Sequence, residues 1–376
     1  MKIAVDAREL TDKPTGVGRY LAEILAGWTQ SADAADVEVT LFSHRPLPVL
    51  ARLTDSSSFP VGARITSAIT PGDGRLLWEQ WTLPRAVGRR FDVLFCPGYS
   101  GPLLARIPLV VTIHDVSFCA HPEWFRWKEG LRRRQTTKAT ARKAAYVIAD
   151  AEFSAYEIGR WLHVSDARIR VIPLGLGGTF ESETSATPVA GSAWTSGRDP
   201  LTLHVGSLFN RRHVDELIRA FARVRAHVPG ATLAIVGDNR TYPPIDYDAL
   251  IRELGLQDAV SLFSYVPDAH LHALYRRARA FAYLSTYEGF GLPPLEALRA
   301  GVPIVVYDTP LAREVYREAA LYVRPHDLDT LSSTLTRLLQ EEEIGRRQLA
   351  AATPVLASYS WADTAARTLA VLREAQ

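Results

Sequence analysis

The feature that most constrains the fold is an alternation of short apolar runs with longer amphipathic runs along nearly the whole chain. In the first half, apolar runs predict strands at Lys2–Asp6, Val37–Phe42, Val93–Cys96, Leu109–Ile113, Val147–Ala149 and Ile169–Ile172. Gly16–Gly27 and Gln135–Ile148 have helical composition. Strands that alternate with helices form βαβ units, so we expect a parallel sheet.

A second alternating series follows a segment rich in Gly, Ser, Thr and Pro. It predicts strands at Leu201–Val205, Thr232–Val236, Val260–Phe263, Ala280–Leu284 and Pro303–Val306, and helices at Val214–Val228, Tyr247–Leu254, Leu271–Arg277 and Leu295–Ala300. We therefore predict α/β architecture with two doubly wound domains, 1–178 and 201–357, joined by a linker at 179–200. Such sheets bind ligands at the C-terminal ends of their strands, which here implies a cleft between the domains.

Composition excludes several classes of protein. Lys and Arg total 43 against 41 Asp and Glu, so a polycation built for nucleic acid is not expected. The two cysteines, Cys96 and Cys119, form no CxxC motif, which favours a reducing compartment. The apolar stretches Pro108–Ile113 and Ala278–Leu284 are far shorter than the ~20 residues of a membrane-spanning helix. The N-terminus is too polar for a signal-peptide core, so we expect a cytoplasmic protein.

The most specific segment is TYEGFGLPPLEALRAG, Thr286–Gly301, which follows a predicted strand. Pro293 and Pro294 suit the start of a helix, whose unpaired N–H groups attract a diphosphate. Glu296 would fall in the first helical turn, and Glu288 in the loop before it. Carboxylates on either side of an anion site can accept hydrogen bonds from sugar hydroxyls. The alternative is that Glu296 only favours the helix dipole and that Glu288 is a surface residue.

Two adjacent cations, Arg211 and Arg212, end a turn that begins at Gly206 and leads from a strand into a helix. Cations at this position can neutralise a diphosphate leaving group. The alternative is a pair of solvated arginines at a helix start.

Other candidates lie in the first half. His114 sits at the end of the strand Leu109–Ile113, where a neutral imidazole can hydrogen-bond a sugar hydroxyl, although a single histidine is more often structural. Gly16 and Gly18 lie in a loop that can approach donor phosphates, with an ordinary turn as the alternative. Histidines and cysteines show no metal-ligand spacing, so we expect no metal site.

Residues 121–143, HPEWFRWKEGLRRRQTTKATARK, carry eight cationic and two anionic side chains. Trp124 and Trp127 precede the run Arg132, Arg133 and Arg134. Such an aromatic and basic segment can bind an anionic lipid headgroup, and the alternative is a solvated helix face. The segment thus predicts peripheral association with the inner face of the cytoplasmic membrane. No nucleic-acid motif accompanies it.

Several motifs, in order, resemble those of the retaining glycosyltransferases of family 4, which have the two-domain GT-B fold. EGFGLPPLEAL resembles that family's donor-site signature, TGVGRY its Gly-rich first loop, and VTIHDVSF its His-Asp segment. Gly206–Phe221 is similar to its phosphate-binding turn. The ending Tyr359–Leu372 looks like its C-terminal helix, so 358–376 is expected to cross back onto the first domain.

The resemblance implies roles for individual residues. It places Glu296 on the ribose hydroxyls and Glu288 near the transferred sugar, with backbone N–H groups of Phe290, Gly291 and Leu292 at the diphosphate or hexose. It implies phosphate contacts for Arg212 and Arg211 and a substrate contact for His114.

The turn departs from the family pattern. Arg212 and His213 stand where Lys and Asn are usual, and Ser207 stands where some members have Arg. These differences leave the geometry of phosphate binding open.

The function that the resemblance implies is metal-independent, retaining hexose transfer from a nucleotide sugar to a saccharide or lipid-linked acceptor. Leu76–Ala86, LLWEQWTLPRA, is similar to segments of bacterial O-antigen and exopolysaccharide mannosyltransferases, which makes GDP-mannose the first donor to test. The alternatives are a nucleotide-sugar epimerase or phosphorylase on the same fold, or an inactive membrane-associated sugar-binding protein.

Overall fold

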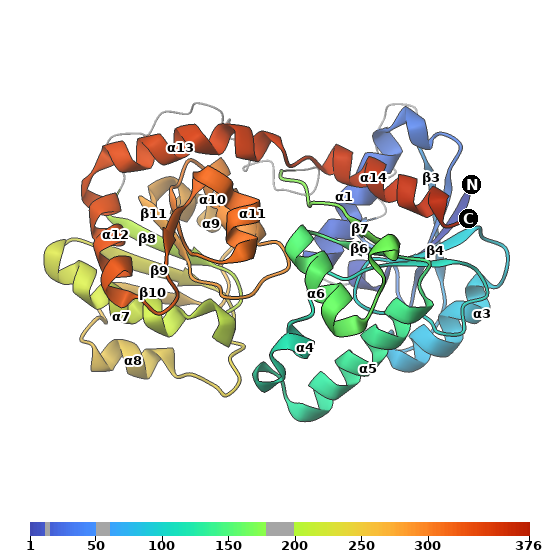
Figure 1. Ribbon diagram of the computed structural model, residues 1–376, viewed down its shortest axis with the longest axis horizontal. Coiled ribbons are helices and arrows are strands. Elements are labelled where there is room, and N and C mark those ends of the chain that lie inside the picture. The colour runs from blue at the N-terminus through green and yellow to red at the C-terminus, as the bar shows by residue number, and fades with distance from the viewer. Residues whose placement is uncertain (12–15, 50–60, 178–198) are drawn as a thin grey trace. The chain divides into compact units, whose positions relative to one another are not determined.

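The computed structural model describes residues 1–11, 16–49, 61–177 and 199–376 (Figure 1). The chain forms two compact units. The first comprises Met1–Ala120, Lys128–Phe180 and Tyr359–Gln376, and the second comprises His121–Trp127 and Glu181–Ser358. Most of the predicted linker, 179–200, falls outside the described residues. None of the helices in the described ranges is long and apolar enough to span a bilayer.

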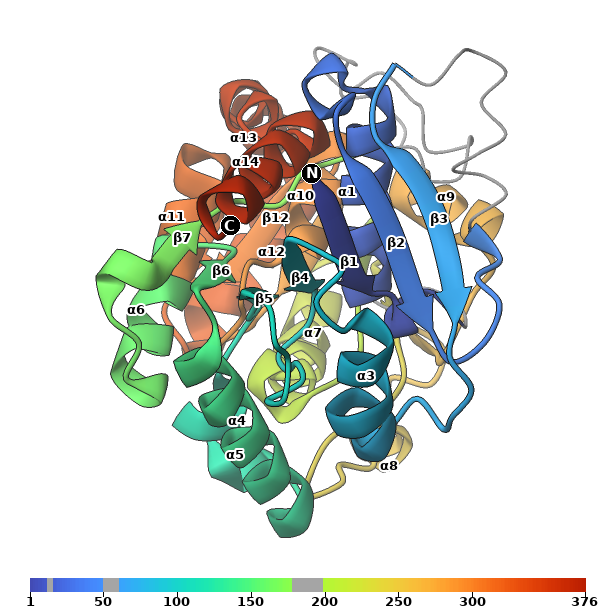
Figure 2. The same ribbon diagram turned by 90° about the vertical axis from the view of Figure 1, so that its right-hand side faces the viewer.

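A seven-stranded parallel sheet forms the centre of the first unit, with the order β3-β2-β1-β4-β5-β6-β7 (Figure 2). Its strands are β1 (Lys2–Asp6), β2 (Glu38–Ser43), β3 (Arg64–Ile69), β4 (Val93–Cys96), β5 (Leu109–Thr112), β6 (Tyr146–Ala149) and β7 (Ile169–Val171). In the register, Ile3 pairs with Val39 on one side and with Val93 on the other. Every residue of β4 and β5 is buried, as expected for a parallel sheet covered on both faces.

The helices of the first unit are α1 (Gly16–Gln30), α3 (Leu83–Val87), α4 (Ser117–Ala120), α5 (Trp127–Lys143), α6 (Glu152–Leu162) and α14 (Trp361–Glu374). The terminal helix α14 packs against α1, and the indole N–H of Trp28 donates to the carbonyl of Ala365 at 2.8 Å. At that contact a Cβ on Gly27 would lie 2.5 Å from the Ala365 side chain.

Two sequence expectations for the first unit need correction. The helix expected over Gln135–Ile148 ends at Lys143, because Tyr146–Ala149 pairs with β5 as strand β6. Strand β3 was not predicted. Its side chains are mostly exposed, so the segment has no buried apolar face to give it a strand pattern.

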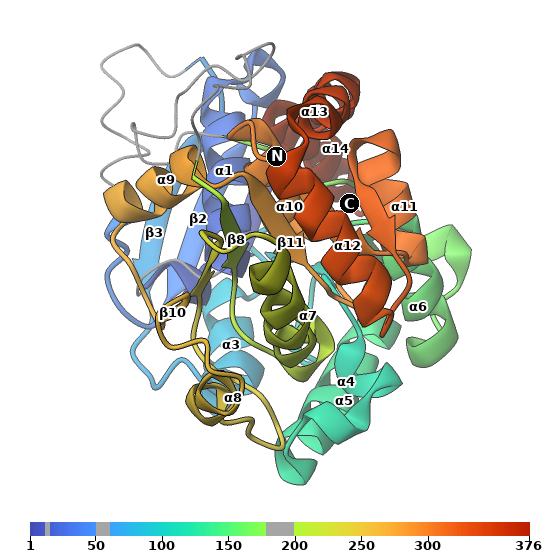
Figure 3. The same ribbon diagram turned by 90° about the vertical axis from the view of Figure 1, so that its left-hand side faces the viewer.

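A six-stranded parallel sheet forms the centre of the second unit, with the order β10-β9-β8-β11-β12-β13. Its strands β8, β10 and β11 are labelled in Figure 3. The strands are β8 (Leu201–Val205), β9 (Thr232–Val236), β10 (Val260–Phe263), β11 (Ala280–Tyr283), β12 (Ile304–Tyr307) and β13 (Leu321–Val323). The helices are α7 (Val214–His227), α8 (Tyr247–Glu253), α9 (Asp268–Arg277), α10 (Leu292–Arg299), α11 (Pro310–Tyr316), α12 (Leu328–Gln340) and α13 (Glu342–Ala357). Apolar residues of α7 and α12 pack on the strands to form the core.

Each sheet has one point at which the chain reverses its direction of winding. The first three strands of the first sheet are laid down from β1 outward, and the rest from β4 outward in the opposite direction. In the second sheet, the same reversal separates β8 from β11. Ligands of such sheets bind outside the carboxyl ends of the strands at this reversal. A ligand of the second unit is therefore expected at the loops after β8 and β11.

Candidate functional site

The loops after β8 and β11 bring Arg211, Arg212 and Glu288 together. A short 3-10 helix, η7 (Asn210–Arg212), carries both arginines. The Nε of Arg212 donates to Oε1 of Glu288 at 2.8 Å, and its Nη1 donates to the carbonyl of Ser207 at 2.8 Å. The Nη2 of Arg211 lies 3.7 Å from Oε2 of Glu288. Three residues that the sequence predicts for one site thus form one buried cluster.

Two further side chains hold Glu288. The hydroxyls of Tyr283 and Ser285 donate to its Oε1 at 2.9 and 3.0 Å. Burial disfavours the carboxylate, but the charges of Arg212 and Arg211 and the hydrogen bonds from Arg212 and Tyr283 outweigh it and lower the pKa of Glu288 to about 2. Glu288 is therefore an anion at neutral pH. Tyr283 and Ser285 were missed, because residues at the end of a buried strand carry no distinguishing sequence signal.

The cluster keeps an excess of positive charge. Two guanidinium groups face one carboxylate, and the Nε of Arg211 is buried without a hydrogen-bond partner. A buried donor without a partner is costly and is satisfied by an anionic oxygen. Charge and donor chemistry therefore fit a phosphate.

Glycine permits the close packing of this turn. The φ of Gly206 is +130°, and a Cβ there would lie 2.5 Å from Nη1 of Arg212. Across the sheet, Gly237 has a φ of +156°, and a Cβ there would lie 2.1 Å from the carbonyl oxygen of Gly206. Larger residues would displace the turn that aims Arg212 at Glu288.

The rest of the acidic motif begins helix α10. Gly291 caps the helix in a left-handed conformation with φ of +91°, and the hydroxyl of Tyr316 donates to its carbonyl at 2.9 Å. Phe290 is buried and Leu292 is the first helical residue. Glu296 is consequently in the second turn, so the expectation of the first turn is wrong. The helix starts three residues before the predicted Leu295, because Gly291 and the two prolines favour an earlier start.

His114 has both ring nitrogens engaged within the first unit. Its Nδ1 lies 2.8 Å from Oδ2 of Asp150, and its Nε2 donates to the carbonyl of Pro97 at 3.0 Å. Burial opposes the imidazolium, while the Asp150 carboxylate favours it and raises the pKa of His114. The ring is therefore fixed by the protein, and its predicted contact with substrate stays a prediction.

The two glycines of the first predicted loop lie in the first turn of α1. A Cβ on Gly16 would meet no atom within 4 Å, whereas Gly18 is buried. Thr15, which precedes them, lies outside the described residues. The pair thus stands at a helix N-terminus rather than within a loop.

The aromatic and basic segment divides between the two units. Trp124 stacks on His121 at a ring separation of 3.9 Å, and His121 meets Tyr287 edge-on, all within the second unit. Trp127 is 70% exposed. On α5, Arg132 and Arg133 are exposed, whereas Arg134 donates to the carbonyl of Phe118.

A buried polar cluster that the sequence analysis missed lies beside the reversal point of the first sheet. Arg8 donates to Asp6 at 2.7 Å and to Glu79 at 2.8 Å. The hydroxyl of Ser100 also donates to Glu79. Asp6 ends β1, and Glu79 comes from the tryptophan-rich segment Leu76–Ala86. The cluster therefore occupies a position where a doubly wound sheet binds a ligand.

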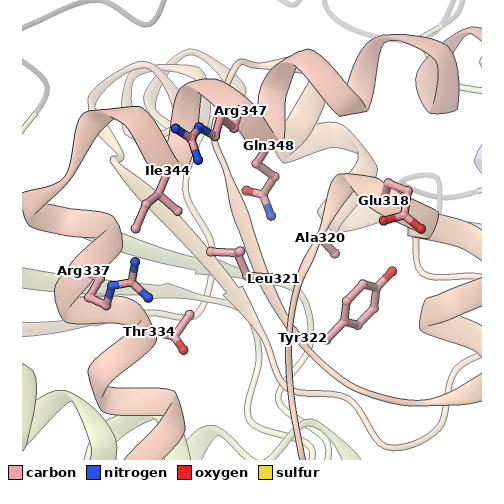
Figure 4. Close-up of a pocket in the computed structure, with 9 residues that line it drawn as sticks. All are labelled: Glu318, Ala320, Leu321, Tyr322, Thr334, Arg337, Ile344, Arg347 and Gln348. Carbon is pink, nitrogen blue, oxygen red and sulfur yellow. The ribbon is translucent and has the colours of Figure 1, made fainter.

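A pocket of about 400 Å³ in the second unit contains none of the predicted residues (Figure 4). Its lining includes Tyr322, Arg337, Arg347 and Gln348. Arg337 is paired with Glu341 and Arg347 with Glu343, and the amide of Gln348 is bonded to the backbone of Ile304. These three polar side chains thus have partners within the fold, as does Tyr322, whose hydroxyl donates to the carbonyl of Ala312.

Within the described residues, His213, Glu216 and His326 gather the donor atoms that a metal ion requires. The spacing of the sequence does not reveal this group, because 110 residues separate His326 from Glu216.

Comparison with known proteins relates both halves to sugar transfer. Residues 14–176 match the model of Glycosyltransferase Family 4, and residues 193–354 match that of Glycosyl transferases group 1. The chain is 31% identical to the MMP alpha-(1->4)-mannosyltransferase of Mycolicibacterium hassiacum over 77% of this chain and 72% of the relative. It is 26% identical to the O-antigen chain mannosyltransferase B of Escherichia coli over 69% and 68%.

Solved structures share the fold across the whole chain. The sucrose-phosphate synthase of Thermosynechococcus elongatus has a TM-score of 0.72 at 19% identity, and covers 100% of this chain and 98% of its own. The Anabaena protein HepE, solved in complex with UDP and glucose, has a TM-score of 0.70 at 19% identity and covers 100% of both chains. These similarities show that the two parallel-sheet units have the GT-B architecture.

Proposed function

Because the chain belongs to the group 1, family 4 glycosyltransferases, we propose that it transfers a hexose from a nucleotide sugar to a saccharide or lipid-linked saccharide, with retention of anomeric configuration. The single observation that carries the proposal is the Arg211, Arg212 and Glu288 cluster at the reversal point of the second sheet. It supplies excess positive charge where a doubly wound sheet binds its ligand.

In the proposed reaction, the arginines stabilise the departing diphosphate. The Nε and Nη1 of Arg212 donate hydrogen bonds to Glu288 and to the carbonyl of Ser207. Among the described residues, no group accepts a hydrogen bond from its Nη2. That N–H group and Arg211 donate to phosphate oxygens as the bond from C1 of the sugar to phosphate breaks. A fixed donor in a dry site is worth about 3–4 kcal/mol of barrier. No metal is needed to neutralise the leaving group.

The acceptor attacks on the face from which the diphosphate leaves. Its hydroxyl proton passes to the departing phosphate oxygen, and a new C1–oxygen bond forms with the configuration retained. Glu288 is poorly suited to act as the nucleophile, because three hydrogen bonds hold its Oε1. We assign it to orienting Arg212 and to the hydroxyls of the transferred sugar, and Glu296 to the ribose.

The proposed donor is GDP-mannose, and the transferred sugar is mannose. The relatives from Escherichia coli and Mycolicibacterium hassiacum are both named mannosyltransferases, which supports this sugar over glucose or galactose. The name O-antigen chain mannosyltransferase also supports a role in cell-surface polysaccharide synthesis.

The first unit is the proposed acceptor-binding unit. Its cluster of Asp6, Arg8 and Glu79 offers charged acceptors and donors to sugar hydroxyls. The exposed Arg132 and Arg133 of α5 suit a peripheral contact with anionic lipid at the cytoplasmic side of the membrane, as does the exposed Trp127 at the start of that helix, which belongs to the second unit.

A panel of nucleotide sugars tests the donor. A ligand that binds only the folded protein raises the midpoint of thermal unfolding, and does so in proportion to the logarithm of its concentration. We expect GDP-mannose to raise the midpoint more than UDP-glucose at the same concentration, and to release GDP when a lipid extract supplies acceptor. If no nucleotide sugar changes the midpoint, the proposed function is wrong.

Two variants separate leaving-group stabilisation from nucleotide binding. Arg212→Ala should slow transfer about 100-fold or more at saturating donor, because it removes a donor to the leaving phosphate. Glu296→Ala should instead weaken binding of GDP about 10-fold, the value of one lost charged hydrogen bond. Calorimetry with GDP and turnover at saturating donor measure the two effects. Unchanged turnover of Arg212→Ala would remove that residue from the site.

A further inference from the structure

Three side chains from distant parts of the second unit converge on one point. His213 is the N-cap residue of α7, Glu216 lies in the first turn of that helix, and His326 lies between β13 and α12. The Nδ1 of His213 is 3.0 Å from Oε1 of Glu216, and the Nδ1 of His326 is 2.7 Å from the same oxygen. Two imidazole nitrogens therefore meet a single carboxylate oxygen.

The neighbours of this group fix how the side chains are oriented. The hydroxyl of Tyr307 donates to Oε2 of Glu216, which leaves Oε1 to the two histidines. The Nε2 of His213 lies 3.1 Å from the hydroxyl of Thr286, whose own proton goes to the carbonyl of Arg211. Thr286 must then accept from Nε2–H of His213. Metal-binding histidines and carboxylates characteristically have such outer partners.

This orientation directs the lone pair of a neutral His213 at a carboxylate oxygen. With Nε2 as the donor to Thr286, Nδ1 of the neutral ring carries no proton. A lone pair and an anionic oxygen at 3.0 Å repel each other unless a proton or a metal ion lies between them. His326 brings a second ring nitrogen to the same oxygen at 2.7 Å, where either its own Nδ1 proton or a metal ion can lie between the two atoms.

We propose that His213, Glu216 and His326 form a Zn²⁺ site. Two imidazole nitrogens and one carboxylate oxygen are a ligand set that zinc accepts in tetrahedral geometry, with the fourth position left open. Bonds of about 2.0 Å in a tetrahedron set the ligand atoms about 3.3 Å apart. The two nitrogen–oxygen separations of 3.0 and 2.7 Å require shifts of only a few tenths of an ångström, and all the ligand atoms lie within 4.8 Å of one another.

Solvent reaches the site through His326. Its side chain is 65% exposed, against 18% for His213 and 15% for Glu216. The ion can therefore enter from solvent, and the open position can hold water.

Bound Zn²⁺ would cross-link the start of α7 to the loop between β13 and α12. His213 follows Arg212 directly, and Thr286 links its ring to the carbonyl of Arg211. The ion thus rigidifies the turn that carries both arginines. The inference goes beyond the proposed function and does not depend on it.

Zinc titration of the untagged full chain tests the site. After treatment with a chelator and dialysis, the protein is titrated with Zn²⁺ at pH 7.5 in competition with a chromophoric chelator. We expect one tight equivalent per chain and a rise in the midpoint of thermal unfolding. Co²⁺ should give the visible absorption of a tetrahedral complex with nitrogen and oxygen ligands.

Variants decide whether these three residues hold the ion. H326A and E216Q should each weaken Zn²⁺ binding at least 10-fold and abolish the Co²⁺ absorption, since each removes one ligand. The matched control is H227A, an exposed histidine at the end of the same helix, which should bind as the unaltered chain does. Absence of tight Zn²⁺ binding in the unaltered chain overturns the proposal. It is also overturned if H326A and E216Q bind Zn²⁺ with the same affinity as the unaltered chain. Nucleotide sugars play no part in these measurements, so the result is independent of the donor experiment.

Discussion

Glu288 illustrates how single residues acquire their chemistry from neighbours. A carboxylate as buried as this one persists as an anion only where cations and donors surround it. Arg212, Tyr283 and Ser285 provide those groups on one oxygen, and Arg211 lies near the other. The sequence identified the two arginines and Glu288 from their residue types beside turns. The two hydroxyls could be found only from the structure.

The ionised Glu288 predicts a specific pH dependence of stability. Its pKa falls from 4.5 to about 2 on folding, so the stabilisation is complete above pH 4.5 and is lost as pH falls from there through 2. At about 1.4 kcal/mol per pH unit, the total is about 3 kcal/mol.

Glu288→Gln should therefore unfold at a lower temperature than the unaltered chain at pH 7, because Arg212 loses its partner, but should lose less stability on acidification. Thermal unfolding followed from pH 7 to pH 2.5 measures both effects. Equal acid slopes for the two proteins would contradict the assignment.

Substitution by alanine should change the free energy of unfolding very differently at two of the predicted donor-site glycines. Gly291 has a φ of +91°, and a Cβ there would lie 2.2 Å from the hydroxyl of Tyr316, so Gly291→Ala should cost about 1–3 kcal/mol. Gly16 is helical with open space around it, and Gly16→Ala should change the free energy of unfolding by less than about 0.5 kcal/mol or raise it slightly. Urea denaturation compares them, and equal costs would show that packing at Gly291 is not what the structure describes.

Among the elements, buried strands were predicted most accurately. Lys2–Asp6, Val93–Cys96, Leu201–Val205 and Thr232–Val236 coincide with β1, β4, β8 and β9. A buried parallel strand is a continuous apolar run, which is visible without knowledge of its neighbours. Exposed β3 lacks that signal, and the helix start at Leu292 depended on the cap at Gly291.

The exposed basic residues of helix α5 predict contact with an anionic membrane surface. Arg132 and Arg133 are exposed on it, and each basic residue near an anionic surface contributes about 1 kcal/mol. Replacing both with Gln should reduce co-sedimentation with phosphatidylserine-containing vesicles about 10- to 30-fold at low salt.

The matched control for α5 removes the same charge from another exposed helix face. Arg346 and Arg347 of α13 are 60% and 80% exposed at their side chains, and their replacement with Gln should leave co-sedimentation unchanged. An equal loss in both double variants would mean that net charge, rather than α5, governs the association.

At the scale of the molecule, the chain end belongs to the unit in which the chain began. Trp361, Leu369 and Leu372 of α14 are buried in the first unit, and Thr364 donates to the carbonyl of Pro173. A Cβ on Gly175 would lie 2.2 Å from the backbone nitrogen of Trp361, which shows how closely the two segments approach.

Truncation after Ser358 should therefore destabilise the first unit. It uncovers the apolar face of α1 and the indole of Trp28, and burial of one large apolar side chain is worth about 1.5–3 kcal/mol. We expect a lower midpoint of thermal unfolding and aggregation of the truncated chain. The control Arg373→Ala removes an exposed ion pair with Asp36 and an exposed hydrogen bond to the carbonyl of Asp33, and it should unfold normally. A truncated chain with an unchanged midpoint would contradict this account.

The sequence by itself determined the α/β class, the strands of both sheets that are buried, and the residue types at the turn and acidic motif of the second unit. These features follow from local periodicity and local turn chemistry, which need no knowledge of distant residues. Only the tertiary structure decided that Arg212 meets Glu288, that Arg8 joins Asp6 to Glu79, and that His326 joins His213 at Glu216. Those contacts depend on the order of strands in each sheet, because neighbouring strand ends bring together residues that are far apart in the chain.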